Sequence, residues 1–146
     1  ALTGPAPPTI PPGENVRWRP LIPIRIIGPN GHARQFPRAV ADPGADDTVF
    51  PLKIAELIHV NLRAATGHGI RWRGQFFPLR FGDVQLEISA NGTTLRWPAI
   101  VAFSAAPIRY PLLGISGFLA CMDASFLGNE RVLSLEPNEA FPVSAG

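Results

Sequence analysis

The sequence contains little cysteine, little lysine and no long apolar run. Its single cysteine, Cys121, cannot form a disulfide within the chain, so nothing indicates an oxidising compartment. Lys53 is the only lysine among 13 basic residues. No apolar run approaches the roughly 20 residues that a membrane helix needs, and no signal-like segment precedes the domain. We therefore expect a soluble chain without a membrane segment, and its compartment stays open.

The composition favours short strands over long helices. The chain has 146 residues with 46% hydrophobic residues, which is enough for one domain with a substantial core. Its 17 prolines and 14 glycines interrupt the sequence too often for long helices. The formal net charge of +2 gives little support for a nucleic-acid partner. An all-β domain is the expected fold class.

The chain divides into a domain and two short ends. Residues 1–15 are Pro-rich and are expected to form an extended tail or linker with few groups able to join a sheet. The domain is expected over 16–138, followed by a C-terminal tail over 139–146. Within the domain, apolar stretches at 21–27 and 36–41 flank Gly28-Pro29-Asn30-Gly31, which predicts a β-hairpin.

Weaker patterns complete the expected secondary structure. A short helix is predicted near 51–58, with Pro51 in its first turn. Asn91-Gly92 predicts a second tight turn. Strands are expected before and after that turn and near the end of the domain, over 76–81, 84–88, 94–103 and 131–135.

The most informative segment is Ala-Val-Ala-Asp-Pro-Gly-Ala-Asp-Asp-Thr-Val-Phe at 39–50, in which an apolar run leads into Asp42. It resembles the active-site segment of the retroviral (retropepsin-type) aspartic proteases: an apolar run, Asp, Thr or Ser, Gly, Ala, and often Asp-Asp-Thr. The alternative interpretation is that Asp-Pro-Gly forms an ordinary surface turn without a catalytic role. The flanking residues on both sides favour the active-site interpretation, and the hairpin prediction places Asp42 at or just beyond its second strand.

Two further segments follow in the order that this family has. Gly67 lies 25 residues beyond Asp42, and Gly67-His68-Gly69-Ile70 resembles the glycine-rich tip of the family's flap. Leu112-Leu113-Gly114 resembles the two apolar residues and glycine that pack behind the catalytic loop, followed there by a short helix. The resemblance covers roughly residues 20–136.

The resemblance implies a retropepsin-like closed barrel with one or two short helices. In aspartic proteases two carboxylates share one proton and act on a water molecule and the scissile carbonyl. No second Asp-x-Gly follows in this chain. The family therefore implies a symmetric homodimer that cleaves a peptide or protein substrate, with Asp42 of each subunit catalytic. It implies no cofactor and no metal.

The resemblance also suggests roles for the neighbouring residues. Gly44 and Asp46 are expected to hold the substrate backbone, and the flap residues 67–70 are expected to cover it. Two roles are considered for Asp47: it contacts the substrate, or it caps the turn or helix that follows. Pro43, Leu113 and Gly114 are expected to support the loop.

Two positions depart from the family. Pro43 stands where the family has Thr or Ser, whose hydroxyl and N–H bond to the opposite subunit, and proline supplies neither group. Ile115 stands where many retroviral members have an arginine that pairs with the acidic residue corresponding to Asp46. Arg63 and Arg109 are the substitutes we consider.

Other functions have less support. A dimeric peptide-binding module of the same fold, in which Pro43 marks lost catalysis, is the main alternative. The Arg–Trp pairs near 17–19, 71–73 and 96–97 would suit single-stranded nucleic acid, but the low net charge argues against that partner. His32, His59 and His68 lack partners at metal-ligand spacing, so no metal site is expected.

Overall fold

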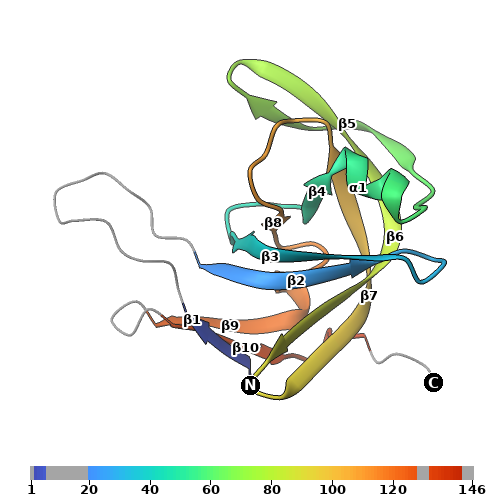
Figure 1. Ribbon diagram of the computed structural model, residues 1–146. Helices are drawn as coiled ribbons and strands as arrows, with labels where there is room; N and C mark the ends of the chain where they lie inside the picture. Colours follow the sequence, from blue (N-terminus) through green and yellow to red (C-terminus); the bar gives the residue numbers. More distant parts are fainter. Residues whose placement is uncertain (1, 6–19, 128–131, 143–146) are drawn as a thin grey trace, which may run out of the picture.

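A computed structural model describes residues 2–5, 20–127 and 132–142 of the chain. Strands predominate in these residues, so the prediction of an all-β chain with short helices is confirmed. One sheet has the order β2-β3-β8-β4-β7-β6-β5 and a second has the order β1-β10-β9 (Figure 1). Their strands are β1 (Leu2–Pro5), β2 (Leu21–Ile27), β3 (Ala33–Ala41), β4 (Val49–Pro51), β5 (Arg63–Trp72), β6 (Gln75–Ala90), β7 (Thr93–Ser104), β8 (Leu112–Leu113), β9 (Met122–Leu127) and β10 (Val132–Pro137).

The larger sheet returns on itself. Strand β2 pairs with β3 on one side and with β6 on the other, so six strands from β2 to β6 form a continuous hydrogen-bonded ring with β5 beside β6. Apolar side chains that alternate along these strands fill the space inside. The fully buried members include Ile24, Ile26, Leu86, Phe103 and Leu113.

The predicted first hairpin is confirmed. Strands β2 and β3 pair antiparallel, and the Gly28 N–H donates to the His32 carbonyl at 2.8 Å across their turn. Gly31 has a φ of 82°, a conformation that glycine adopts without strain. Strand β3 ends at Ala41, which places Asp42 directly after the second strand.

The turn at Asn91-Gly92 is also confirmed, with φ values of 53° and 78° between β6 and β7. The two strands expected over 76–81 and 84–88 are instead one strand, β6. Gly82 lies inside this strand at a point where its backbone passes close to Val60. A Cβ at position 82 would lie 2.3 Å from Val60 Cγ1, so the glycine permits a close approach and does not mark a break in the strand.

The expected flap tip at Gly67–Ile70 is wrong in position. These residues lie within β5, and the hairpin turn is at Arg73-Gly74, with φ values of 50° and 81°. A two-residue turn of this type requires positive φ at both positions. Gly67, with a φ of 84°, instead lies in the irregular part of β5, where the register with β6 shifts between Ala64 and Gly69.

The Pro-rich segment at 1–15 was expected to stay out of the sheets, and this is wrong for its first residues. Leu2–Pro5 forms β1 and pairs antiparallel with β10, from Leu2 opposite Leu135 to Pro5 opposite Val132. Proline is tolerated there because β1 is an edge strand. Residues 6–19 lie outside the described residues. At the other end, the tail expected from 139 begins inside the fold, because the Phe141 ring lies 5.6 Å from that of Trp97.

The helices are short, as expected. Helix α1 (Leu52–Leu57) follows Pro51, which is its N-cap rather than part of its first turn, and η1 (Leu119–Cys121) is a single 3₁₀ turn. Among the described residues, no helix has the length and apolar character needed to cross a membrane.

Trp97 connects the long hairpin to the segment after β8, which suggests a first test. Its side chain is 1% exposed, and its indole N–H donates to the Gly117 carbonyl at 2.9 Å. We expect Trp97→Phe to lower the free energy of unfolding by about 1–3 kcal/mol, because this bond and part of the packing with Phe118 and Phe141 are lost. Urea denaturation followed by circular dichroism measures the change. Trp72→Phe, on the half-buried end of β5, should cost less than about 1 kcal/mol; equal losses would contradict the role of Trp97.

Candidate active site

Asp42 begins a tight loop where β3 ends. Its backbone N–H donates to the Leu113 carbonyl at 3.0 Å, and its carbonyl accepts from the Ala45 N–H at 3.1 Å. Its carboxylate oxygen Oδ1 accepts from the Gly44 N–H at 2.9 Å. The Asp42 side chain is half-buried, and Pro43 and Gly44 are exposed. The loop therefore presents a carboxylate of fixed position at the protein surface.

A second segment, at 112–116, crosses the loop from behind. Strand β8 lies between β3 and β4, where Leu112 is opposite both Val40 and Val49. Past β8, the Ile115 N–H donates to the Ala45 carbonyl and the Ser116 N–H to the Asp46 carbonyl, both at 2.9 Å. The loop is thus fixed by backbone hydrogen bonds that do not depend on its side chains.

Gly114 is required at this crossing for steric reasons. A Cβ at this position would lie 2.3 Å from the Asp47 carbonyl oxygen and 2.6 Å from that of Ala45. Both atoms belong to the backbone and cannot move aside without displacing the loop. The Leu-Leu-Gly segment therefore lies directly against the loop that carries Asp42.

Thr48 closes the loop and was not among the site residues inferred from the sequence. Its side chain is 1% exposed; its hydroxyl donates to the Ser116 carbonyl at 2.8 Å and accepts from the Gly114 N–H at 3.2 Å. Its backbone N–H also donates to the Ser116 carbonyl, at 3.1 Å, and its carbonyl accepts from Ala102 at 2.7 Å. The local sequence does not reveal this role, because the burial of Thr48 and its hydrogen-bond partners both depend on the distant segment at 114–116.

The other acidic residues of the loop have different surroundings. Asp46 is exposed and Asp47 is half-buried. The two arginines considered for Asp46 are engaged elsewhere: Arg63 pairs with Asp83 at 2.7 Å, and the Arg109 guanidinium lies 5.3 Å from the Tyr110 ring centre. The capping alternative for Asp47 is wrong for α1, since Pro51 occupies the N-cap without a side-chain hydrogen bond.

The residues expected in the flap divide into two groups. Ile70 contacts the small apolar cluster of Val49, Leu79 and Ala102, to which Leu112 also belongs. Because Val49 and Leu112 flank the Asp42 loop, the part of the β5–β6 hairpin around Ile70 and Leu79 packs on the strands that hold the loop. His68 instead lies on an exposed part of β5, with its ring 5.7 Å from that of Phe81, and the neighbouring Gly67 is exposed too.

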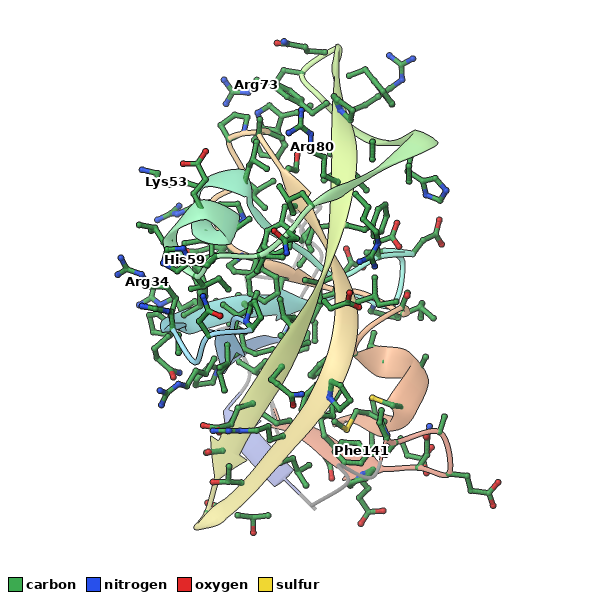
Figure 2. The ribbon with its side chains drawn as sticks, turned by 90° about the vertical axis from the view of Figure 1, so that its right-hand side faces the viewer. Arg34, Lys53, His59, Arg73, Arg80 and Phe141 are labelled. Carbon is green, nitrogen blue, oxygen red and sulfur yellow. The ribbon has the colours of Figure 1, made fainter. Side chains whose placement is uncertain are left out.

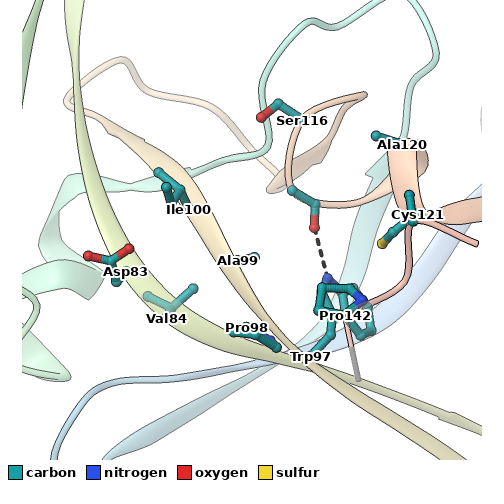
Figure 3. A pocket seen from close by; sticks show the side chains of 12 residues that line it. Asp83, Val84, Trp97, Pro98, Ala99, Ile100, Ser116, Ala120, Cys121 and Pro142 are labelled. Atoms are coloured by element: carbon teal, nitrogen blue, oxygen red, sulfur yellow. Dashed lines mark hydrogen bonds between the residues drawn. The ribbon is translucent and has the colours of Figure 1, made fainter. Parts of the chain in front are cut away.

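A pocket of about 430 Å³ lies between the β6–β7 hairpin and the segment around 116–121 (Figure 3). Ser116 and Gly117 line it, but Asp42 does not. Burial raises the pKa of the Cys121 thiol, which donates to the Phe118 carbonyl at 3.1 Å, so this thiol stays protonated near neutral pH and is a poor nucleophile. The polar groups of this pocket do not form an acid–base or nucleophilic constellation.

The described part of the chain contains no group of three or more His, Cys, Asp or Glu side chains arranged to hold a metal ion. At the Asp42 loop, the group placed to take part in acid–base chemistry is the carboxylate of Asp42, which is half-buried and hydrogen-bonded to the Gly44 N–H. A single carboxylate cannot act as general base and general acid in the same step, so an enzyme built on Asp42 needs a second acidic group.

Comparison with known proteins finds similarity among solved structures. No family model matches the chain, and no curated protein matches it. Among solved structures, it is similar to the EIAV protease complexed with the inhibitor HBY-793, with 20% sequence identity and a TM-score of 0.43. The alignment covers 69% of this chain and 86% of that protease. At this level of similarity, function has to be inferred from the Asp42 loop itself.

The hydroxyl of Thr48 gives a test of how the loop is held. Thr48→Val keeps the shape of the side chain but leaves the Gly114 N–H without its acceptor, while Ser116 retains the bond from the backbone of residue 48. We expect a loss of about 1–3 kcal/mol in the free energy of unfolding. Thr94→Val is the matched control, since the exposed Thr94 hydroxyl is hydrogen-bonded to the Ser89 hydroxyl at the surface, and it should cost less than about 0.5 kcal/mol. Similar values for both variants would show that the Thr48 bonds do not hold the crossing.

Proposed function

We propose that this protein is an aspartic endopeptidase with a retropepsin-like fold, which acts as a symmetric homodimer with one Asp42 from each subunit. The observation that carries the proposal is the loop after β3, where a half-buried carboxylate is presented on a backbone pinned to residues 113–116. A surface turn would not need this support. A catalytic carboxylate does, because its position relative to a second carboxylate and the substrate has to be held closely.

The proposed reaction requires both copies of Asp42. Two carboxylates a few ångströms apart cannot both stay ionised, so they share one proton. The ionised carboxylate activates a water molecule, and the protonated one donates its proton to the oxygen of the scissile carbonyl. Because Asp42, Pro43 and Gly44 lie at the surface of one chain, a two-fold related copy can approach them.

The surroundings of the loop suggest an extended peptide with apolar side chains near the scissile bond. Ile70, Ile108 and Leu112 are half-buried apolar residues of the cluster beside the loop. Gly44, Asp46 and Asp47 would contact the substrate backbone, and the β5–β6 hairpin, with Gly67–Ile70 in its first strand, would cover it. Pro43, Leu113 and Gly114 would shape the loop without taking part in the reaction.

Pro43 supports a second candidate function, a dimeric peptide-binding module without catalysis. The residue is exposed at the place where two loops would meet, and its ring offers neither a hydroxyl nor an N–H for a bond across the two-fold axis. Without such bonds, the two carboxylates would be held too loosely for the reaction, while the loop and the β5–β6 hairpin would still bind peptide.

The first test replaces the carboxylate. Asp42→Asn preserves size and removes the charge, so peptidase activity should fall by a factor on the order of 10³. The wild type should cleave fastest at acidic to mildly acidic pH and be blocked by a statine-type transition-state mimic. Asp83→Asn, at an exposed carboxylate of β6, should leave cleavage unchanged.

Two results would refute this proposal. Peptidase activity that persists in Asp42→Asn would assign the chemistry to another residue. Sedimentation that shows an active protein to be monomeric at every concentration would exclude a dyad shared between subunits.

The second test separates the enzyme from the binding module. Pro43→Thr supplies a hydroxyl and an N–H, and we expect the dimer to tighten by about 1–3 kcal/mol, since the new bonds form in symmetric pairs. In the enzyme, kcat/KM should rise with dimer affinity, whereas the binding module would dimerise more tightly and stay inert. Pro29→Thr, in the exposed turn between β2 and β3, is the control and should change neither quantity. An unchanged dimer affinity in an efficient enzyme would show that position 43 does not govern the subunit contact.

A further inference from the structure

The β5–β6 hairpin carries an unusual share of the positive charge. Residues 63–80 include four arginines and no acidic residue. The rest of the chain holds nine basic and 11 acidic residues, so the positive net charge of the protein comes from this hairpin. The Asp42 loop has the opposite character, with three aspartates and no basic residue between 42 and 48.

Three of these arginines have no carboxylate partner within the described part of the chain. Arg63, at the base, forms an ion pair with Asp83 at 2.7 Å. We call the other three, Arg71, Arg73 and Arg80, the hairpin arginines. All three side chains are exposed, and Figure 2 shows Arg73 and Arg80 along the projecting hairpin.

Arg71 and Arg80 share one side of the hairpin with an aromatic ring, and Arg73 lies in the turn. Arg71 is directly opposite Phe76 in the strand register, and its guanidinium lies 6.0 Å from the centre of the Phe76 ring, which is 49% exposed. Along β6, exposed residues at 76, 78 and 80 alternate with the half-buried Phe77 and the buried Leu79, and Leu79 belongs to the apolar cluster. The apolar side of the hairpin therefore faces the strands that hold the Asp42 loop, and the charged side faces solvent.

We propose that the hairpin arginines select acidic polypeptides as substrates. The inference rests on the proposed peptidase function and specifies its substrate class. The hairpin packs beside the strands that hold the Asp42 loop, and its guanidinium groups lack carboxylate partners among the described residues. Such a cluster raises the local concentration of negatively charged chains near the loop and speeds their encounter with it. This electrostatic attraction acts on the encounter with the substrate, before the peptide bond is cleaved. It therefore changes kcat/KM and leaves kcat unaltered.

An acidic peptide fits these residues better than a nucleic acid does. Three arginines on one hairpin are few for a phosphate backbone, and the charge of the remaining chain is negative. A substrate that combines acidic flanks with an apolar centre would match both sides of the hairpin.

The test uses two synthetic peptides that share one apolar core and carry either three glutamates or three glutamines on the flanks. At about pH 6, where glutamate is ionised, and about 10 mM salt, where the Debye length is roughly 30 Å, the wild type should cleave the glutamate peptide with about tenfold higher kcat/KM. The preference should shrink to about twofold at about 0.5 M salt. In R71Q/R73Q/R80Q it should disappear, while cleavage of the glutamine peptide stays unchanged.

A matched control removes the same charge elsewhere. R25Q/R34Q/K53Q changes three exposed basic residues on β2, β3 and α1, and it should retain most of the preference. Equal rates for the two peptides in the wild type, or a preference that survives in R71Q/R73Q/R80Q, would overturn the inference.

Failure of the proposed function gives a different result. If neither peptide is cleaved, the peptidase proposal fails, and fluorescence anisotropy of the labelled peptides on Asp42→Asn then tests the hairpin alone. Tighter binding of the glutamate peptide, lost when the hairpin arginines are also replaced, supports the inference that these arginines bind acidic polypeptides. Equal binding of both peptides overturns it.

Discussion

The crossing of two chain segments behind Asp42 is the contact on which the candidate site depends. The loop at 42–48 and the segment at 113–116 exchange backbone hydrogen bonds, and the buried Thr48 hydroxyl connects Gly114 with Ser116. Buried backbone groups without partners are costly, so this mutual satisfaction fixes both segments. Gly114 permits the close approach, because any larger residue would meet two carbonyl oxygens.

The same crossing explains why a surface carboxylate can be well placed. Strands β3 and β4 enter and leave the loop on opposite sides of β8, and all three belong to the ring of strands around the core. The β5–β6 hairpin rests on this arrangement through the cluster that includes Ile70 and Leu112. The same strands therefore support the hairpin and the Asp42 loop, and the side of the hairpin that carries Arg71 and Arg80 faces solvent.

The exposed Pro43 gives the proposed dimer a particular physical problem. Symmetric association must bring two carboxylates together, although their mutual repulsion opposes this unless a proton is shared. A residue that donates hydrogen bonds across the axis would offset the repulsion, and proline does not. In the proposed dimer, the stability of the subunit contact and the capacity for catalysis would thus be linked at position 43.

The sequence alone predicted the elements that depend on a few adjacent residues. Asn91-Gly92 and the turn at 28–31 are set by backbone conformations that few residues adopt, so both hairpins, and with them the position of Asp42 after β3, could be predicted. The Leu-Leu-Gly segment was found by resemblance alone, and nothing local indicated the contacts that Gly114 makes.

The tertiary structure decided what depends on distant partners. The hairpin turn lies at Arg73-Gly74 because β5 and β6 pair in a register that the glycine pattern at 67–69 does not reveal. Leu2–Pro5 becomes a strand only because β10 offers an edge. The role of Thr48 likewise requires Gly114 and Ser116, more than 60 residues away in the chain. The sequence by itself therefore determined which residue begins the candidate site, and the packing of distant segments decided how it is held, because hydrogen bonds and close approaches between them have no local signal.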